Sequence, residues 1–136
     1  MEEIKTRKRR VNYEDAECEA FVETIKWQYP NLYKMMIHVP NGGKRGAAEA
    51  AKFKKLGVKK GFPDYVFFYP SGKFPGLIIE MKKSMEHGGS KAVVSAEQKE
   101  WIMNLRERGY AAYICEGADE ALDTLKKYLR SENIMG

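Results

Sequence analysis

Three ionisable residues stand at the ends of two neighbouring apolar segments. Asp64 comes directly before one segment, and Glu80 and Lys82 close the segment that begins at Leu77. Side chains alternate between the two faces of a strand, so Glu80 and Lys82 share one face. If the turn between the segments is symmetric about Lys73, Asp64 lies across from Lys82 and within a residue or two of Glu80. We therefore expect three charges at one strand end.

Two carboxylates that close together repel each other and are costly to desolvate unless a divalent cation binds between them. A site with only oxygen ligands favours Mg²⁺ or Mn²⁺ over zinc. A metal held in this way can coordinate a phosphodiester oxygen and acidify a bound water, while the ammonium of Lys82 orients that water and offsets charge. The pattern thus indicates metal-dependent phosphodiester hydrolysis. The alternative is an exposed ion pair between Glu80 and Lys82, which contributes little.

A further acid lies near the start of the first predicted helix. Glu14 precedes Cys18 by four residues and Phe21 by seven, which places it at the N-terminal end of the apolar face. It can reach the metal as another carboxylate, or it can serve only to stabilise the helix dipole. Glu17 and Glu19 are nearby alternatives, and spacing separates them only weakly.

The pattern of apolar residues predicts the elements that must position these groups. Helices are expected over about 14–29, 46–57, 95–109 and 118–129, and strands over 33–39, 65–69, 77–81 and 110–116. Pro30 should end the first helix, and Ser95 and Gln98 have the spacing of a capping box. Since residues 65–69 are apolar on both faces, that strand should be central. The order indicates a mixed α/β sandwich.

Length and composition indicate one globular domain. The chain has 136 residues, of which 43% are hydrophobic. We expect a domain over 14–130, between a basic N-terminal tail, 1–13, and a short C-terminal tail, 131–136. No apolar run has the length of a membrane span, and no apolar run follows the first basic residues as in a signal peptide. We therefore expect no membrane partner and a cytoplasmic location.

The net charge of +5 is concentrated in lysine and arginine clusters at 5–10, 44–45 and 52–60. Such clusters favour a polyanionic partner, because each neutralised phosphate releases condensed counterions. The alternative for a basic run is a solvated tail or helix face, which is the interpretation of Lys126 and Lys127.

The two cysteines and the aromatic residues are interpreted as structural. Cys18 and Cys115 lie far apart without a Cys-x-x-Cys pattern, so free thiols are expected rather than a disulfide or a zinc site. His38 is interpreted as structural and not as a general base. Trp27 and Tyr33 are expected to pack on helices, the alternative being stacking on unpaired bases.

Five separated blocks of sequence resemble those of one known family. In order they are PNGGKRG (40–46), KLGVKKGFPD (55–64), GLIIEMKK (76–83), SAEQKEWIMNLRERGY (95–110) and ICEG (114–117). Together they resemble the VRR-NUC domain, the virus-type replication-repair nuclease branch of the PD-(D/E)XK superfamily, from about Glu14 to Leu129. The resemblance implies a restriction-endonuclease-like αβββαβ core, a mixed β-sheet flanked by helices, with the helix over 46–57 as an insertion. It also implies a metal-dependent, structure-selective DNA nuclease.

The resemblance assigns roles to the residues that match its motifs. Asp64 and Glu80 correspond to metal-binding acids, the carbonyl of Met81 to an additional metal ligand, and Lys82 to the catalytic lysine. Glu14 matches the first-helix glutamate best, because the QYP segment at 28–30 sets the register of that helix.

Three further assignments complete the expected site. Glu17 remains the alternative to Glu14 as the first-helix acid. Gln98 matches a glutamine that can reach back toward the metal, and this role does not exclude the capping box. The PNGGKRG turn offers backbone N–H groups and two cations for phosphate binding, so the expected nucleic-acid-binding residues are Asn41, Gly43, Lys44 and Arg45.

These observations predict a Mg²⁺- or Mn²⁺-dependent endodeoxyribonuclease that acts on branched DNA, a flap or a four-way (Holliday) junction, in viral or phage replication and repair. In-line attack of water would leave 5′-phosphate and 3′-hydroxyl ends, as the resemblance implies. A homodimer is expected, since it would present two sites to a four-way junction. The alternatives are a branched-DNA-binding module without catalysis and a sequence-specific restriction enzyme, for which 136 residues leave no added recognition segment.

Overall fold

A computed structural model describes residues 13–40, 46–84 and 93–130, with only the backbone given for residues 13 and 14. In chain order the elements are α1 (Tyr13–Gln28), α2 (Pro30–Tyr33), β1 (Met36–His38), α3 (Ala47–Lys55), β2 (Tyr65–Phe67), β3 (Leu77–Lys82), α4 (Ala96–Glu107), β4 (Ala111–Glu116) and α5 (Gly117–Leu129). The predicted αβββαβ order is confirmed, with α3 inserted between β1 and β2 and α5 following the core.

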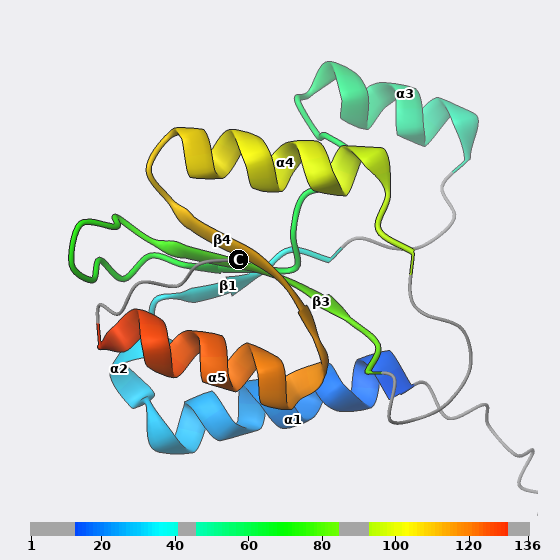
Figure 1. Cartoon of the computed structure of the whole chain (residues 1–136). Coiled ribbons are helices and arrows are strands. Elements are labelled where there is room, and N and C mark those ends of the chain that lie inside the picture. The colour runs from blue at the N-terminus through cyan, green and yellow to red at the C-terminus, as the bar shows by residue number, and fades with distance from the viewer. Residues whose placement is uncertain (1–12, 41–45, 85–92, 131–136) are drawn as a thin grey trace, which may run out of the picture.

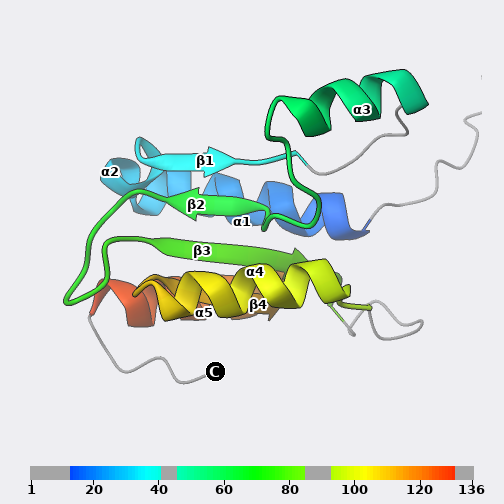
Figure 2. The same ribbon diagram turned by 90° about the horizontal axis from the view of Figure 1, so that it is seen from above.

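The strands form a mixed sheet in the order β1-β2-β3-β4. β1, β2 and β3 are antiparallel neighbours, whereas β3 and β4 run parallel. Parallel neighbours need a crossover connection, and α4 supplies it. Helices α1 and α5 cover one face of the sheet and α4 covers the other (Figures 1 and 2). The prediction that β2 is a central strand is confirmed.

Strand β3 divides its side chains between the two layers of the core. Leu77, Ile79 and Met81 belong to the larger cluster, which also contains side chains from α1 and α5. Ile78 packs instead with Ile102 of α4 in the smaller cluster. Side chains alternate between the two faces along a strand, so Glu80 and Lys82 lie on the same face as Ile78. This is the face of the sheet that α4 covers. The sequence pattern of β3 thus directs its charged end toward α4.

The register of the β2–β3 hairpin differs from the prediction. A turn centred on Lys73 would pair Tyr65 with Met81, but Tyr65 pairs with Ile79. The bridge between Ser71 and Phe74 places the centre of the turn between Gly72 and Lys73. The segment that joins β2 to this bridge is one residue longer than the segment that joins the bridge to β3, which shifts the register further. The expected pairing of Asp64 with Lys82 is therefore wrong, and continuing the observed register places Asp64 opposite Glu80.

Two boundaries near the first strands also differ from the prediction. Pro30 does not simply end the first helix, because it begins the short helix α2. Proline is tolerated in the first turn of a helix, where its missing N–H has no helical partner. The first strand is consequently shorter than expected, and β2 ends at Phe67 rather than Tyr69. In the described part of the chain, no helix is both long and apolar enough to cross a membrane.

A loop just before β2 rests on the first turns of α4. The indole Nε1 of Trp101 donates to the carbonyl of Lys60 at 3.2 Å, and the rings of Phe62 and Trp101 meet edge to face with centroids 4.8 Å apart. Gly61 has a φ of 82°, and a Cβ added there would lie 2.6 Å from Cβ of Glu97. These contacts fix the path by which the chain enters β2.

We expect Gly61→Ala to lower the free energy of unfolding by more than Gly109→Ala does. Both glycines have positive φ, which costs another residue about 1–2 kcal/mol, but only at Gly61 does an added Cβ meet a neighbouring atom within 4 Å. Urea denaturation of the two variants measures the difference. Equal losses of stability in the two variants would show that Gly61 does not pack closely against Glu97 of α4.

Candidate active site

Asp64, Glu80 and Lys82 meet where the β2–β3 hairpin opens. Glu80 is only 4% exposed. Its Oε2 accepts a hydrogen bond from Nε2 of Gln98 at 2.8 Å and lies 3.3 Å from Nζ of Lys82. Oδ2 of Asp64 accepts the backbone N–H of Met81 at 2.8 Å. The structure thus brings together two carboxylates, an ammonium and an amide from β3, from α4 and from the residue before β2.

The second oxygen of Glu80, Oε1, is buried and has no hydrogen-bond partner within the described residues. A buried polar atom in this state is costly and calls for an explanation. The pKa of Glu80 is raised to about 7, first by burial, then by the neighbouring charge of Asp64 and by the hydrogen bond that a protonated Glu80 makes to Asp64, while Lys82 opposes these effects. Near neutral pH this carboxyl therefore holds a proton readily, and a cation that replaced the proton would relieve the same cost.

The donor set fits a hard divalent cation. Asp64 and Glu80 offer carboxylate oxygens at the ends of adjacent strands, and Oε1 of Glu80 has no hydrogen-bond partner among the described residues. Oxygen ligands suit Mg²⁺ or Mn²⁺. Among the residues that the structure describes, no group of three or more histidine, cysteine or acidic side chains could hold a metal. The Glu14 side chain lies outside the described part, so its role as a further ligand stays a prediction. The same applies to the carbonyl of Met81.

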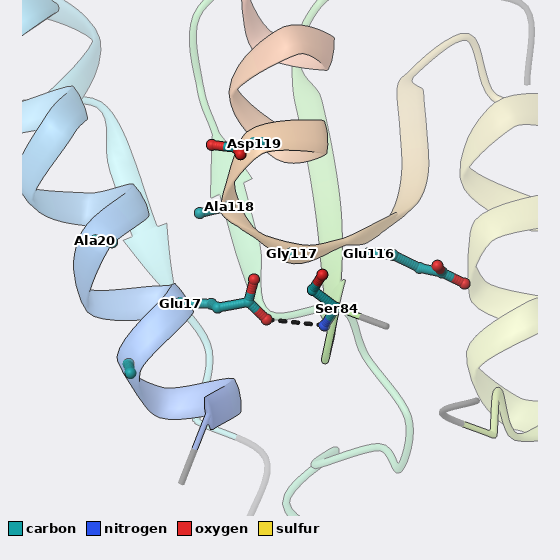
Figure 3. Close-up of a pocket in the computed structure, with 8 residues that line it drawn as sticks. Glu17, Ala20, Ser84, Glu116, Gly117, Ala118 and Asp119 are labelled. Atoms are coloured by element: carbon teal, nitrogen blue, oxygen red, sulfur yellow. Dashed lines mark hydrogen bonds between the residues drawn. The ribbon is translucent and has the colours of Figure 1, made fainter. Parts of the chain in front are cut away.

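Glu17, the alternative first-helix acid, makes different contacts. Its Oε2 accepts the backbone N–H of Ser84 at 2.8 Å, as Figure 3 shows. A Cβ added to Gly117 would lie 2.5 Å from its Oε1, so the carboxylate abuts the first residue of α5. A negative charge is favourable at a helix N-terminus. In this arrangement Glu17 ties α1 to the chain after β3 and to the start of α5. Within the described residues it forms no three-acid group with Asp64 and Glu80 that could hold a metal.

A pocket of about 300 Å³ lies beside this contact (Figure 3). Its walls come from α1, from the chain after β3, from the last residue of β4 and from the start of α5, with Ala16, Glu17, Ala20, Ser84, Glu116, Gly117, Ala118 and Asp119 lining it. Its charged side chains are all acidic, which disfavours a phosphate ligand. We assign it no part in the chemistry of the site.

Gln98 makes both of the contacts that its position suggested. Its backbone N–H donates to Oγ of Ser95 at 3.1 Å, and its Oε1 accepts the N–H of Ser95 at 3.0 Å. Its remaining amide group, Nε2, is the one that donates to Glu80. One side chain therefore caps α4 and holds the buried carboxylate of β3.

Residues expected to bind DNA are only partly described. Asn41, Gly43, Lys44 and Arg45 lie outside the described residues and stay predictions. His38 is described: its Nδ1 donates to the carbonyl of Asp64 at 2.9 Å. The ring also lies 4.9 Å from that of Tyr65, centroid to centroid. These contacts support a structural role for His38 in holding β1 beside the start of β2.

The expectation that Trp27 packs against helices is wrong, because its side chain is 72% exposed. Phe21 and Ile25 form the buried stripe of α1, and a residue two positions beyond Ile25 points about 200° away from it. Tyr33 is also exposed, at 37%. The cysteines are free, as predicted, although Cys18 is only partly buried.

Sequence reasoning did not identify Trp101, which holds the loop that leads into Asp64. A usable signal was present, because Gln98, Trp101 and Leu105 follow one another at the three- and four-residue spacing of a single helix face. That spacing predicts that the three side chains share one surface. It does not indicate which loop would lie against them.

We expect the raised pKa of Glu80 to make the metal-free protein less stable as pH rises from about 4.5 to about 7. In this range the unfolded chain has released the proton that the folded chain retains, so the unfolded state is favoured as pH rises. The matched control is Glu80→Gln, which lacks this titration. Thermal unfolding in EDTA should show wild-type stability falling relative to the variant, and Mg²⁺ should reverse the fall in the wild type alone. Parallel pH profiles would contradict the assignment.

Comparison with known proteins agrees with the fold and identifies a family. The family model described as the VRR-NUC domain matches residues 5–119. A solved structure named "VRR_NUC domain protein" is 30% identical, with a TM-score of 0.72 over 86% of this chain and 88% of that chain. A search of curated proteins gives no match. Because the family model spans most of the chain, including the hairpin that carries Asp64, Glu80 and Lys82, the chain belongs to the VRR-NUC domain family.

Proposed function

We propose that the protein is a divalent-metal-dependent, structure-selective endonuclease that hydrolyses phosphodiester bonds in branched DNA. The observation that carries the proposal is the buried carboxylate of Glu80, which has one oxygen without a partner among the described residues and lies beside Asp64 and Lys82. A carboxylate so placed is poorly explained by stability alone. It is well explained as half of a metal site.

Asp64 and Glu80 would hold Mg²⁺ or Mn²⁺, with Glu14 and the Met81 carbonyl as further candidate ligands. When bound, such a cation polarises a phosphodiester oxygen and lowers the pKa of a coordinated water. Lys82 has a side chain that is only 12% exposed and is kept beside Glu80, so its charge acts with little screening from solvent. It can orient the attacking water and offset the negative charge of the transition state.

The proposed substrate is a flap or a four-way junction, cut to leave 5′-phosphate and 3′-hydroxyl ends, in viral replication or repair. Membership of a nuclease-type family and the net charge of +5 support a DNA substrate. Asn41, Gly43, Lys44 and Arg45, which precede α3 in the sequence, remain the proposed phosphate contacts.

The proposed active form is a homodimer, for which an apolar surface on β1 offers support. Met35, Ile37 and Phe68 are 44%, 51% and 55% exposed. Phe68 N donates to the carbonyl of Met35 and Ile37 pairs with Val66, so the three side chains lie on neighbouring chain segments. β1 is an outer strand of the sheet. A second copy paired at this edge would cover both the strand and the apolar side chains.

We expect Asp64→Asn to lower cleavage of a labelled four-way junction or flap by about 100-fold or more, since even residues that only support a metal ligand matter by about 10–100-fold. Binding of the same DNA should persist. Cleavage is followed on gels with Mg²⁺, Mn²⁺ or EDTA, and Asp123→Asn, an exposed acid of α5, is the control. Cleavage in EDTA would contradict the mechanism. Salt-sensitive binding without cleavage in any metal would favour the alternative, a branched-DNA-binding module without catalysis.

We expect Ile37→Lys to convert the dimer to a monomer, because the change places a charge within the proposed apolar contact. Light scattering after size-exclusion chromatography measures the mass. Met103→Lys is the matched control, since Met103 is 61% exposed but lies on α4. A wild-type monomer, or equal effects of the two variants, would remove β1 as the interface.

A further inference from the structure

Helix α3 has no buried residue, although it is nine residues long. It stands apart from the sheet at the end where β2 begins and β3 ends (Figures 1 and 2). A short helix gains most of its stability from packing one face against the protein. Phe53 is the one side chain of α3 that is partly buried, so most of the surface of the helix is accessible to a partner.

The charges of this segment identify the chemistry of that partner. Five exposed lysines lie in α3 and directly after it, namely Lys52, Lys54, Lys55, Lys59 and Lys60, whereas the helix itself contains one acid, Glu49. Three of the lysines fall in the last turn of α3. A surface of this kind complements a run of phosphates.

Two exposed apolar residues lie between the lysines. Leu56 is 69% exposed and Val58 is 48% exposed. Their backbone is held by a defined turn, since Val58 N donates to the carbonyl of Phe53 at 2.9 Å and Gly57 has a φ of 95°. The turn therefore displays apolar side chains at a fixed position within a basic surface. Phosphates make no favourable contact with apolar side chains, whereas bases without a stacking partner can pack against them.

The segment leads into the proposed active site along a path held against α4. Residues 59–62 rest on α4 through Trp101, and Nζ of Lys59 lies 5.8 Å from the centre of the Trp101 ring. Asp64 follows two residues later. A DNA strand held by α3 would therefore lie close to the carboxylates of the β2–β3 hairpin.

We propose that residues 46–60, which we call the α3 arm, bind DNA at a branch point. In this proposal Lys52 and Lys55, one helical turn apart, contact the phosphate backbone, and Leu56 and Val58 lie against bases exposed at the junction. The arm rests on the proposed function, because its partner is the substrate of that site. It explains why the helix is basic, exposed and tipped with apolar residues.

The first test compares two double variants that remove the same charge. Lys52→Ala/Lys55→Ala alters the arm, and Lys126→Ala/Lys127→Ala alters the last turn of α5. Binding of a labelled four-way junction is measured by fluorescence anisotropy over a salt series, in protein that also carries Asp64→Asn. The arm variant should bind more weakly, and its slope of log affinity against log salt should fall by about 1.8, or about 0.9 for each phosphate that is no longer neutralised. The α5 variant should match its parent.

A second variant separates the apolar tip from the charges. Leu56→Ser should weaken junction binding several-fold and leave linear duplex binding unchanged, because only the junction exposes unstacked bases. Since Leu56 is exposed, the variant should fold normally, and thermal unfolding checks this. Equal reductions in affinity for the two DNAs would overturn the proposed base contact.

Failure of the arm and failure of the nuclease proposal give different results. If the arm is wrong, the two double variants bind equally while the wild type still cleaves. If the nuclease proposal alone is wrong, the wild type does not cleave while the arm variant still binds DNA more weakly. Vesicles of anionic phospholipid test a membrane surface, which is the alternative polyanionic partner for these lysines. Loss of vesicle binding in the arm variant, with DNA binding unchanged, would overturn the proposal in favour of a membrane contact.

Discussion

The burial of one carboxylate, that of Glu80, is the constraint on which the site depends. A charge at this position is disfavoured by loss of solvent and by the nearby Asp64, and it is favoured by Lys82 and by the amide of Gln98. These opposing effects leave the group close to its titration midpoint at neutral pH, with one oxygen unsatisfied within the described residues. A site in this condition gains from a cation more than an exposed pair of acids would.

The fold supplies this constraint by joining two kinds of strand pairing. The antiparallel pairing of β2 with β3 carries the start of one strand to the end of the other, which places Asp64 beside Glu80. The parallel pairing of β3 with β4 requires a crossover, and α4 lies over the same face as a result. The first turn of α4 then reaches β3 through Gln98, while Trp101 holds the loop that precedes Asp64.

Local signals predicted a large part of this arrangement. The capping box of Ser95 and Gln98 and the alternation within β3 both depend on residues a few positions apart, so the sequence shows them directly. The predicted register of β2 and β3 differs from the observed one by two residues, because the register depends on how the intervening turn closes. The exposure of Trp27 was missed because it depends on which face of α1 meets the sheet.

The sequence by itself determined the order of the elements, the face on which Glu80 and Lys82 lie and the family to which the chain is similar. Each of these follows from residue types at short or matched spacings. Only the tertiary structure decided that Glu80 has an oxygen without a partner among the described residues, that Glu17 is held at the start of α5, and that α3 contains no fully buried residue. These properties depend on which groups the folded chain brings near and on which it leaves in solvent, and spacing along the chain does not contain that information.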